Sequence, residues 1–298
     1  MFAITIGKFE ALHRGHNYLI TTTIEYARKH GLKSGVLSFV PHPARILVGD
    51  EYKPLYSKKE QAFLIENYDI DRWIPYPFDR DFAGMSPLDF CHMLRDELNC
   101  RALIVGEGFR FGRNREGTLN SFRPLSIEVI EVPDCEVENE KVSTSQIRDY
   151  LAAGRVQEAN KRLTRPFFIM GEVQKGRQIG RVIGFPTANM HPDDDKFLPP
   201  DGVYASGITV RGQALAGVTN IGTNPTVVRG SMRKVETHIF GFDADIYDEE
   251  VIVELYDFIR AERVFGGLEE LKKQIAEDSE KAKRRMSFLE GRGAKSGE

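Results

Sequence analysis

The chain has 298 residues, which is enough for two domains of ordinary size. Its 41% hydrophobic and 29% charged residues are typical of a globular protein. No apolar run approaches the ~20 residues that span a bilayer, and a net charge of −3 does not favour non-specific binding to nucleic acid.

The start of the chain and its cysteines indicate a cellular compartment. The first residues form an apolar strand and lack the basic region and cleavage site of a signal peptide. The three cysteines show no paired or metal-type spacing. We therefore expect a cytoplasmic protein with reduced thiols, whose partners are small molecules and not nucleic acid or a membrane. Oligomeric state has no signal in the sequence.

The first half of the chain alternates apolar strands with amphipathic helices. Gly31 is expected to end the first helix, and Ser57 with Glu60 predicts a capping box. The alternation predicts a parallel sheet with helices on both faces, whose ligands bind at the carboxyl ends of the strands. The expected strands are 2–6, 35–40, 102–105 and 127–132, the expected helices are 16–29, 57–67, 87–98 and 145–153, and 41–43 is an expected loop.

The second half, from about residues 162–166 onward, has strands in series. Arg211-Gly212 is a plausible hairpin turn, and a long helix at 268–289 is expected to bury Leu271, Ile275 and Ala282. Serial strands without helices predict an antiparallel barrel or sandwich. The expected strands are 168–173, 203–210, 214–220, 235–240 and 251–258.

The segment from Gly7 to His16 directly follows the first strand. It places His13 and His16 on either side of Gly15, where a helix is expected to open. The free N–H groups and positive end of a helix attract an anion, and imidazoles add donors beside them. The segment therefore predicts a phosphate site. The alternatives are a solvated helix face or half of a metal site, although no nearby Cys or carboxylate completes a ligand set.

Two further segments of the first half could hold ligands. Ser143, Thr144, Ser145 and Arg148 lie at the start of an expected helix, which suits a second phosphate cradle, with an ordinary N-cap as the alternative. The loop at 106–112 combines glycines, aromatic residues and an arginine, which suit a flat ring beside a phosphate. A plain glycine-rich loop is the alternative there.

The second half carries its own candidate site. Thr187 and Asn189 offer hard, neutral oxygen ligands suited to a magnesium ion that bridges phosphates. Glu236 lies in an expected strand and could remove a proton from an alcohol, the alternative being a carboxylate that faces outward. Glycines that let main-chain amides approach a polyphosphate lead into this region, at Gly171, Gly176, Gly180 and Gly184.

In this order, the motifs resemble those of the prokaryotic bifunctional riboflavin kinase/FMN adenylyltransferase (FAD synthetase) family, from about Ala3 to Leu289. The resemblance implies a Rossmann-like nucleotidyltransferase domain with a parallel sheet at 1–160. It also implies a riboflavin kinase domain at 166–298, a six-stranded antiparallel β-barrel with a C-terminal helix. The matching segments are 7–16, 39–43, 143–148, 184–189, 200–204, 220–226 and 236–239.

The resemblance also implies an activity and a set of site residues. Riboflavin would be phosphorylated to FMN with Mg-ATP, and FMN adenylylated to FAD with a second ATP, releasing pyrophosphate. Glu236 would be the base of the first reaction, His13 and His16 would stabilise charge in the second, and Thr187 and Asn189 would hold Mg²⁺. The implied ATP-binding residues are Gly7, Phe9, Gly15, Ser143, Thr144, Ser145, Arg148, Gly171, Gly176, Gly180, Arg181 and Gly184. The implied flavin-binding residues are Phe39, Pro41, His42, Phe109, Arg110, Phe111 and Asn114.

Four positions depart from the family pattern. Glu10-Ala11 stands where the family has Asp-Gly, Gly108 replaces an Asp of the flavin-site motif, and Asp248 replaces a glycine. We expect the turn before the histidines to differ, because Ala11 disfavours positive φ. The alternatives are a riboflavin kinase with a degenerate adenylyltransferase domain, a flavin-sensing binding protein, and a nucleotidyltransferase for another phosphorylated acceptor.

Overall fold

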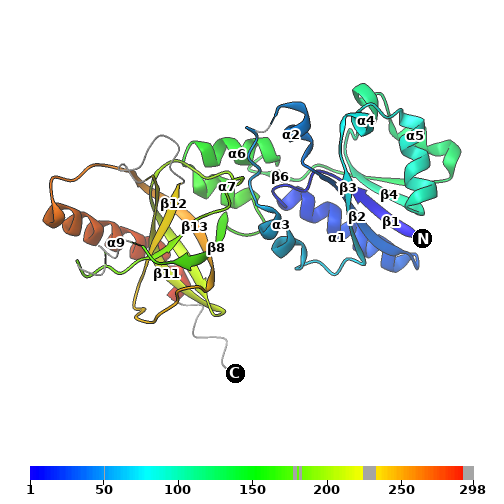
Figure 1. Cartoon of the computed structure of the whole chain (residues 1–298). Helices are drawn as coiled ribbons and strands as arrows, with labels where there is room; N and C mark the ends of the chain where they lie inside the picture. The colour runs from blue at the N-terminus through cyan, green and yellow to red at the C-terminus, as the bar shows by residue number, and fades with distance from the viewer. Residues whose placement is uncertain (50, 177–179, 181–182, 224–232, 291–298) are drawn as a thin grey trace. The chain divides into compact units, whose positions relative to one another are not determined.

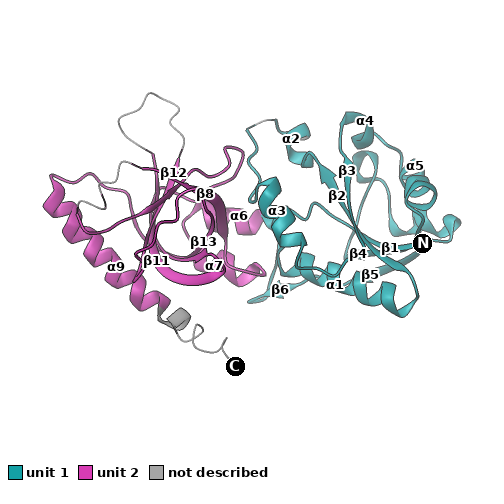
Figure 2. Cartoon of the chain, turned by 60° about the horizontal axis from the view of Figure 1, so that its bottom comes forward, with its two compact units in different colours: residues 1–144 teal, residues 145–298 magenta. Residues whose placement is uncertain are grey.

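The computed structural model describes residues 1–49, 51–176, 180, 183–223 and 233–290. The chain divides into two compact units, residues 1–144 and 145–298 (Figure 2). The expected domain limits of 1–160 and 166–298 stay a prediction. Among the described residues, no helix combines the length and the apolar character needed to cross a bilayer.

Unit 1 is built on a five-stranded parallel sheet with the strand order β3-β2-β1-β4-β5 (Figure 1). One face packs through Ile4, Ile6 and Leu103, and the other packs through Ala3 and Ala102 against Ala27 of α1. Helices therefore cover both faces, as the alternating pattern predicts. The strands are β1 (Phe2–Ile6), β2 (Lys33–Val40), β3 (Arg72–Pro77), β4 (Cys100–Gly106) and β5 (Glu128–Val132), and the helices are α1 (Arg14–Lys29), α2 (Pro43–Leu47), α3 (Lys58–Ile65), α4 (Arg80–Ala83) and α5 (Pro87–His92).

Several expected elements of unit 1 have other limits. The first helix begins at Arg14 and not at His16, because His13 caps it. The expected helix 87–98 is α-helical only to His92 and continues as a π-helical turn, Met93–Glu97. The expected loop 41–43 leads at Pro43 into α2. The sequence analysis omitted β3, α4, two 3₁₀ turns (Arg113–Arg115 and Leu119–Leu125) and a small hairpin of β6 (Glu136–Val137) with β7 (Glu140–Lys141).

Unit 2 is a closed six-stranded barrel in the order β10-β11-β12-β9-β8-β13, which confirms the barrel and not the sandwich. The strand omitted by the sequence analysis is the three-residue β9. Gly31 and the Arg211-Gly212 turn have positive φ, as their expected roles require. The strands are β8 (Phe168–Gln174), β9 (Ala188–Met190), β10 (Gly202–Val210), β11 (Gln213–Gly222), β12 (Lys234–Ile239) and β13 (Glu250–Ala261), and the helices are α6 (Thr144–Ala152), α7 (Val156–Arg162) and α9 (Leu268–Glu290).

The barrel has a hydroxyl ladder inside and α9 outside. Thr219 Oγ1 lies 2.7 Å from Ser206 Oγ and 2.8 Å from Thr237 Oγ1, and all three residues are buried. On the outer face, Ala282 and Met286 of α9 pack with apolar residues of β10 and β11. Since side chains alternate along a strand, the neighbours of Thr219 and Thr237 face outward, toward the region of α9.

Candidate functional site

One row of residues across the barrel brings the predicted base beside a predicted metal ligand. Glu236 of β12 pairs with Asn189 of β9 on one side and with Asn220 of β11 on the other. The row continues through Val203 of β10 to Arg260 of β13. Residues directly opposite in antiparallel strands share a face, so these polar side chains gather on the outer surface of the barrel.

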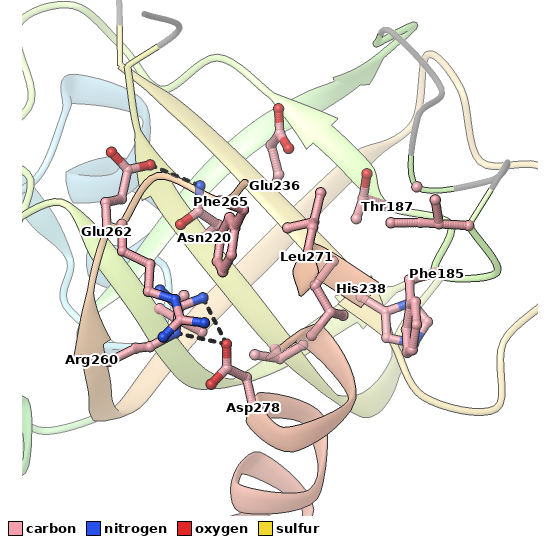
Figure 3. A pocket seen from close by; sticks show the side chains of 16 residues that line it. Phe185, Thr187, Asn220, Glu236, His238, Arg260, Glu262, Phe265, Leu271 and Asp278 are labelled. Carbon is pink, nitrogen blue, oxygen red and sulfur yellow. Dashed lines mark hydrogen bonds and ion pairs between the residues drawn. The ribbon is translucent and has the colours of Figure 1, made fainter. Parts of the chain in front are cut away.

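A cavity of about 280 Å³ lies on this surface, between the strands and α9. Figure 3 shows Glu236 between Thr187 and the Asn220–Glu262 pair. Much of the wall is apolar or aromatic and suits a flat ring system. The apolar part of the lining comes from Ile183, Phe185, Val203, Val218, Phe265, Leu271 and Ile275.

A second cavity of about 250 Å³ meets the first at Thr187, which lines both. It is bordered by Gly176, Asn189 and the segment 242–247. Asn189 Nδ2 donates to Thr187 O at 3.1 Å and to Thr187 Oγ1 at 3.2 Å. This uses the amide hydrogens within the pair and leaves Asn189 Oδ1 as an acceptor, a neutral oxygen of the kind that Mg²⁺ accepts.

The described residues contain no group of three or more His, Cys, Asp or Glu side chains that could hold a metal ion. A cation at Thr187 and Asn189 would therefore depend on oxygens brought by the substrate. That requirement matches Mg²⁺, which binds proteins through few ligands and takes others from phosphates and water. The donor set fits an ion that arrives with a nucleotide.

The glycines before this motif make room for protein atoms as well. A Cβ at Gly176 would lie 2.7 Å from Asn189 Cγ, and one at Gly180 would lie 2.2 Å from the carbonyl oxygen of Phe185. At both positions, therefore, a side chain would collide with described atoms of the segment 185–189. Their ATP-binding role, with that of Gly171 and Gly184, stays a prediction. Arg181 and residues 224–226 of the predicted motifs lie outside the described residues.

The sequence analysis missed a charged wall of the first cavity. Arg260 Nε donates to Asp278 Oδ2 at 2.8 Å, and Gln274 Nε2 donates to Asp278 Oδ1 at 2.8 Å. Asp278 is 2% exposed, so α9 holds the Arg260 guanidinium in place through a buried carboxylate. The sequence did contain one signal for this wall. Asp278 lies on the same face of the helix as Ile275 and Ala282, which are expected to be buried.

The predicted site residues of unit 1 follow three neighbouring strands, β2, β1 and β4. The segments 7–16, 39–42 and 108–114 come after the carboxyl ends of β1, β2 and β4 or include those ends. Because the three strands are adjacent and parallel, their carboxyl ends share one edge of the sheet. The fold therefore brings the predicted phosphate and flavin segments to the same edge.

His13 and His16 form a stacked pair at the start of α1. His13 Nδ1 accepts from the backbone N–H of His16 at 3.2 Å, and the ring centroids are 3.7 Å apart. Burial lowers the pKa of His13 to about 4, and burial and His13 together lower the pKa of His16 well below its usual value. Both rings are therefore neutral near pH 7. His16 Nδ1 is buried without a hydrogen-bond partner in the described structure.

The turn before the histidines does not require a glycine at position 11. Positive φ occurs at Phe9 and Leu12, but not at Ala11, whose side chain is buried. A Cβ at Gly15 would lie 3.2 Å from His13 Cε1, so the close approach that requires glycine there comes from the imidazole. The nucleotide-binding roles of Gly7, Phe9 and Gly15 stay predictions.

The predicted flavin loop is divided between surface and core. Arg110 and Asn114 are exposed, whereas Phe111 is 6% exposed and packs between Phe90 and Phe122. Gly108 has φ +70°, and its N–H donates to Glu131 Oε1 at 2.9 Å. Glu131 thus supplies a carboxylate close to the position at which the family motif has its Asp.

The remaining predicted residues lie at β2 and at the division of the chain. Phe39 packs against Phe82 and is followed by a cis Val40–Pro41 peptide bond. Ser143 and Thr144 end unit 1, whereas Ser145 and Arg148 belong to unit 2. Within unit 2, the Arg148 guanidinium carbon lies 5.1 Å from the ring centre of Phe197. The roles of these residues in phosphate and flavin binding stay predictions.

Comparisons with known proteins cover both units. A family model described as FAD synthetase matches residues 1–146, and one described as riboflavin kinase matches residues 163–286. The bifunctional riboflavin kinase/FMN adenylyltransferase of Bacillus subtilis is 34% identical, over 96% of this chain and 93% of its own length. The Escherichia coli protein of the same description is 34% identical, over 92% of this chain and 90% of its own.

A solved structure shares the whole fold. A crystal structure described as a macrolide-efflux protein from Streptococcus pneumoniae superposes with a TM-score of 0.84 at 28% identity, and the match covers 95% of this chain and 94% of that chain. Both halves of the chain therefore have counterparts that occur together, and in the same order, in other proteins.

Proposed function

Because this chain belongs to the bifunctional riboflavin kinase/FMN adenylyltransferase family, we propose that unit 2 phosphorylates riboflavin and that unit 1 adenylylates the FMN produced. The chain is a transferase that converts riboflavin to FMN and FMN to FAD, with ATP as the co-substrate of both steps.

The register of Glu236 beside Asn189, where two cavities meet, carries the proposal for the kinase step. The cavity with the aromatic wall would take the flavin ring, and the cavity beside Gly176 would take ATP. Glu236 would accept the proton of the ribityl 5′-hydroxyl as that oxygen attacks the γ-phosphate and ADP leaves. Positioning and charge neutralisation supply most of the catalysis of phosphoryl transfer, so few protein groups are needed.

Thr187 Oγ1 and Asn189 Oδ1 would hold Mg²⁺ together with ATP oxygens. The ion would neutralise phosphate charge. The chain itself would contribute the positions of these groups, because the pairing of β9 with β12 places Glu236 on the strand next to Asn189. Neighbouring antiparallel strands place opposed Cβ atoms ~5 Å apart, which is suitable for a base and a phosphate-bound ion that act on one substrate.

In unit 1, the FMN phosphate would attack the α-phosphate of ATP and release pyrophosphate. His13 Nδ1 is occupied as an acceptor, so its proton lies on Nε2 and can be donated to a phosphate oxygen. Neutral imidazoles at a helix N-terminus stabilise growing negative charge by hydrogen bonding without a fixed cation. His16 Nδ1 offers a second buried polar atom at the same place.

Products made from riboflavin, Mg²⁺ and ATP test this function. We expect the pure chain to form FMN and then FAD. Glu236→Gln should lower kcat for FMN formation by a factor of 10²–10⁴, the usual contribution of a general base, while ATP binding is retained. Glu277→Gln is the matched control, because Glu277 is exposed on α9.

The outcomes separate the alternatives. FMN without FAD would indicate a kinase alone, and tight flavin binding without turnover of either kind would indicate a sensor. Near-normal FMN formation by the Glu236→Gln variant would remove Glu236 from its role.

A further inference from the structure

Glu10, which stands where the family has Asp, is a buried carboxylate with several donors. It follows β1 and is 1% exposed. Tyr52 Oη donates to Glu10 Oε2 at 2.5 Å, and the backbone N–H of Leu55 donates to Glu10 Oε1 at 2.8 Å. The desolvation free energy of a buried carboxylate is offset only when hydrogen bonds from the protein replace those from water. The two donors to Glu10 supply such bonds.

Glu10 also reaches His42, a predicted flavin-binding residue that follows β2. His42 Nδ1 accepts from the backbone N–H of Ala44 at 3.2 Å, which caps α2. An acceptor at Nδ1 leaves the proton of the neutral ring on Nε2, and this atom lies 3.3 Å from Glu10 Oε2. The cap therefore selects one tautomer, and the carboxylate lies beside Nε2 at ion-pair distance without the geometry of a hydrogen bond.

Tyr52 completes the arrangement from the segment that follows α2. Its ring stacks on His42 with centroids 4.9 Å apart and planes 7° apart, while its hydroxyl is bonded to Glu10. Glu10 thus connects three segments: the turn that leads to His13, the turn after β2, and the segment before α3. We call Glu10, His42, Tyr52 and Leu55 the Glu10 clasp.

We propose that Glu10 is a positioning residue of the adenylylation site, which holds the His42 imidazole in place for the flavin substrate. The proposal rests on the function proposed for unit 1. On this proposal, the glutamate that replaces the family's aspartate at position 10 contributes to the site, because it reaches the Tyr52 hydroxyl and the Leu55 N–H at normal hydrogen-bond distances. Since Glu10 acts through His42, its loss affects recognition of FMN more than that of ATP.

A double-substitution cycle tests this inference. In the FMN-to-FAD reaction, Glu10→Gln should raise KM for FMN about tenfold or more and change KM for ATP less than twofold, because loss of a charged hydrogen-bond partner costs that much. In a His42→Ala background, Glu10→Gln should add little further loss, because coupled residues are not additive. Glu25→Gln, an exposed change on α1, is the matched control.

Two measurements keep the result interpretable. The single tryptophan, Trp73, lies in unit 1 with its ring centroid 5.8 Å from that of Phe9, so its fluorescence reports whether unit 1 is folded. Riboflavin phosphorylation in the same samples measures the concentration of active chain. If Glu10→Gln unfolds unit 1, Tyr52→Phe replaces it in the cycle with Tyr18→Phe as control, and a smaller rise in the FMN KM is expected.

An unchanged FMN KM, equal effects on both substrates, or effects of Glu10→Gln and His42→Ala that simply add would each overturn the proposal. Failure of the proposed function is distinguishable. In that case the unsubstituted chain itself would form no FAD from FMN and ATP.

Discussion

At the scale of single residues, His13 caps a helix and is also proposed to donate a hydrogen bond to a phosphate. Its Nδ1 accepts the N–H group of His16 in the first turn of α1, which fixes the helix start two residues earlier than the sequence analysis expects. The same bond places the proton on Nε2. Burial keeps the ring neutral, so a group that usually titrates near neutral pH becomes a fixed hydrogen-bond donor.

This burial makes the stability of unit 1 depend on pH. The pKa of His13 is lowered to about 4, so between pH 6.5 and 4 the unfolded chain binds a proton that the folded unit does not. Stability must therefore fall as pH decreases through this window, by about 2 kcal/mol from pH 7 to 5 for His13 alone. The lowered pKa of His16 acts in the same direction.

Urea unfolding followed by Trp73 fluorescence measures this dependence. His13→Asn is the informative variant, because asparagine also caps a helix but does not titrate. Between pH 7 and 5, we expect the free energy of unfolding of the variant to fall by about 2 kcal/mol less than that of the unsubstituted chain. Equal losses in the two proteins would show that His13 is not the source of the dependence.

Residue-level prediction succeeded where a local hydrogen bond decides the structure. Ser57 and Glu60 form both bonds of the predicted capping box, at 3.3 and 2.8 Å. The expected difference in the turn at Ala11 stays a prediction, and in this chain the residues with positive φ are Phe9 and Leu12. Substitution of a glycine predicts strain only if that residue itself has positive φ, and the sequence does not show which residue does.

At the scale of elements, α9 and β13 together build the wall of the 280 Å³ cavity that faces Glu236. The buried Asp278 carboxylate binds Arg260 on one oxygen and Gln274 on the other. The Arg260 and Arg263 guanidinium carbons lie 5.6 and 4.7 Å from the ring centre of Phe265. Packing of α9 on the barrel therefore also sets the position of a cation and an aromatic ring in the cavity.

Asp278→Asn should disturb this wall. We expect KM for riboflavin to rise about tenfold, because the Arg260 guanidinium loses its charged partner, and KM for ATP to change less than twofold. Steady-state kinetics of FMN formation measure both values, with Glu277→Gln on the exposed side of the same helix as the control. Equal increases in the two KM values would assign Asp278 to general stability and not to this cavity.

Elements were predictable where the hydrophobic period was long and undisturbed. The strands β1, β2, β10, β11 and β13 and the helices α1 and α9 were found within a few residues of their limits. The strand β3 was missed because it contains Pro75 and Pro77, which the sheet tolerates because β3 is an edge strand. The strand β9 has only three residues, too few for a periodic signal, yet it carries Asn189.

At the scale of the whole molecule, two compact units carry two reactions that share FMN. The order of many short motifs along the chain predicted this organisation, and the two family models confirm the family. The sequence analysis missed the charged wall and the Glu10 clasp. Both depend on residues far apart in the sequence, such as Glu10 with Leu55, that only the folded chain brings together.

Separate sites predict that each reaction can be removed alone. His16→Ala should abolish FAD formation from added FMN and leave FMN formation from riboflavin within about twofold of the unsubstituted rate, because the proposed base and ligand pair of FMN formation lie in unit 2. Glu236→Gln should give the reverse result. Separation of FMN and FAD after incubation with ATP measures both, and parallel loss of the two products in either variant would contradict independent sites.

The row that carries Asn189, Glu236 and Asn220 has a consequence for how this enzyme can diverge. Hydrogen bonds between the main chains of neighbouring strands set the distances between the residues of this row. Substitutions elsewhere in the chain therefore leave the relative positions of these three residues unchanged. Insertion or deletion of one residue within β12 would instead turn the carboxylate into the barrel interior. Relatives should accordingly tolerate changes of length in their connecting loops and none inside this strand.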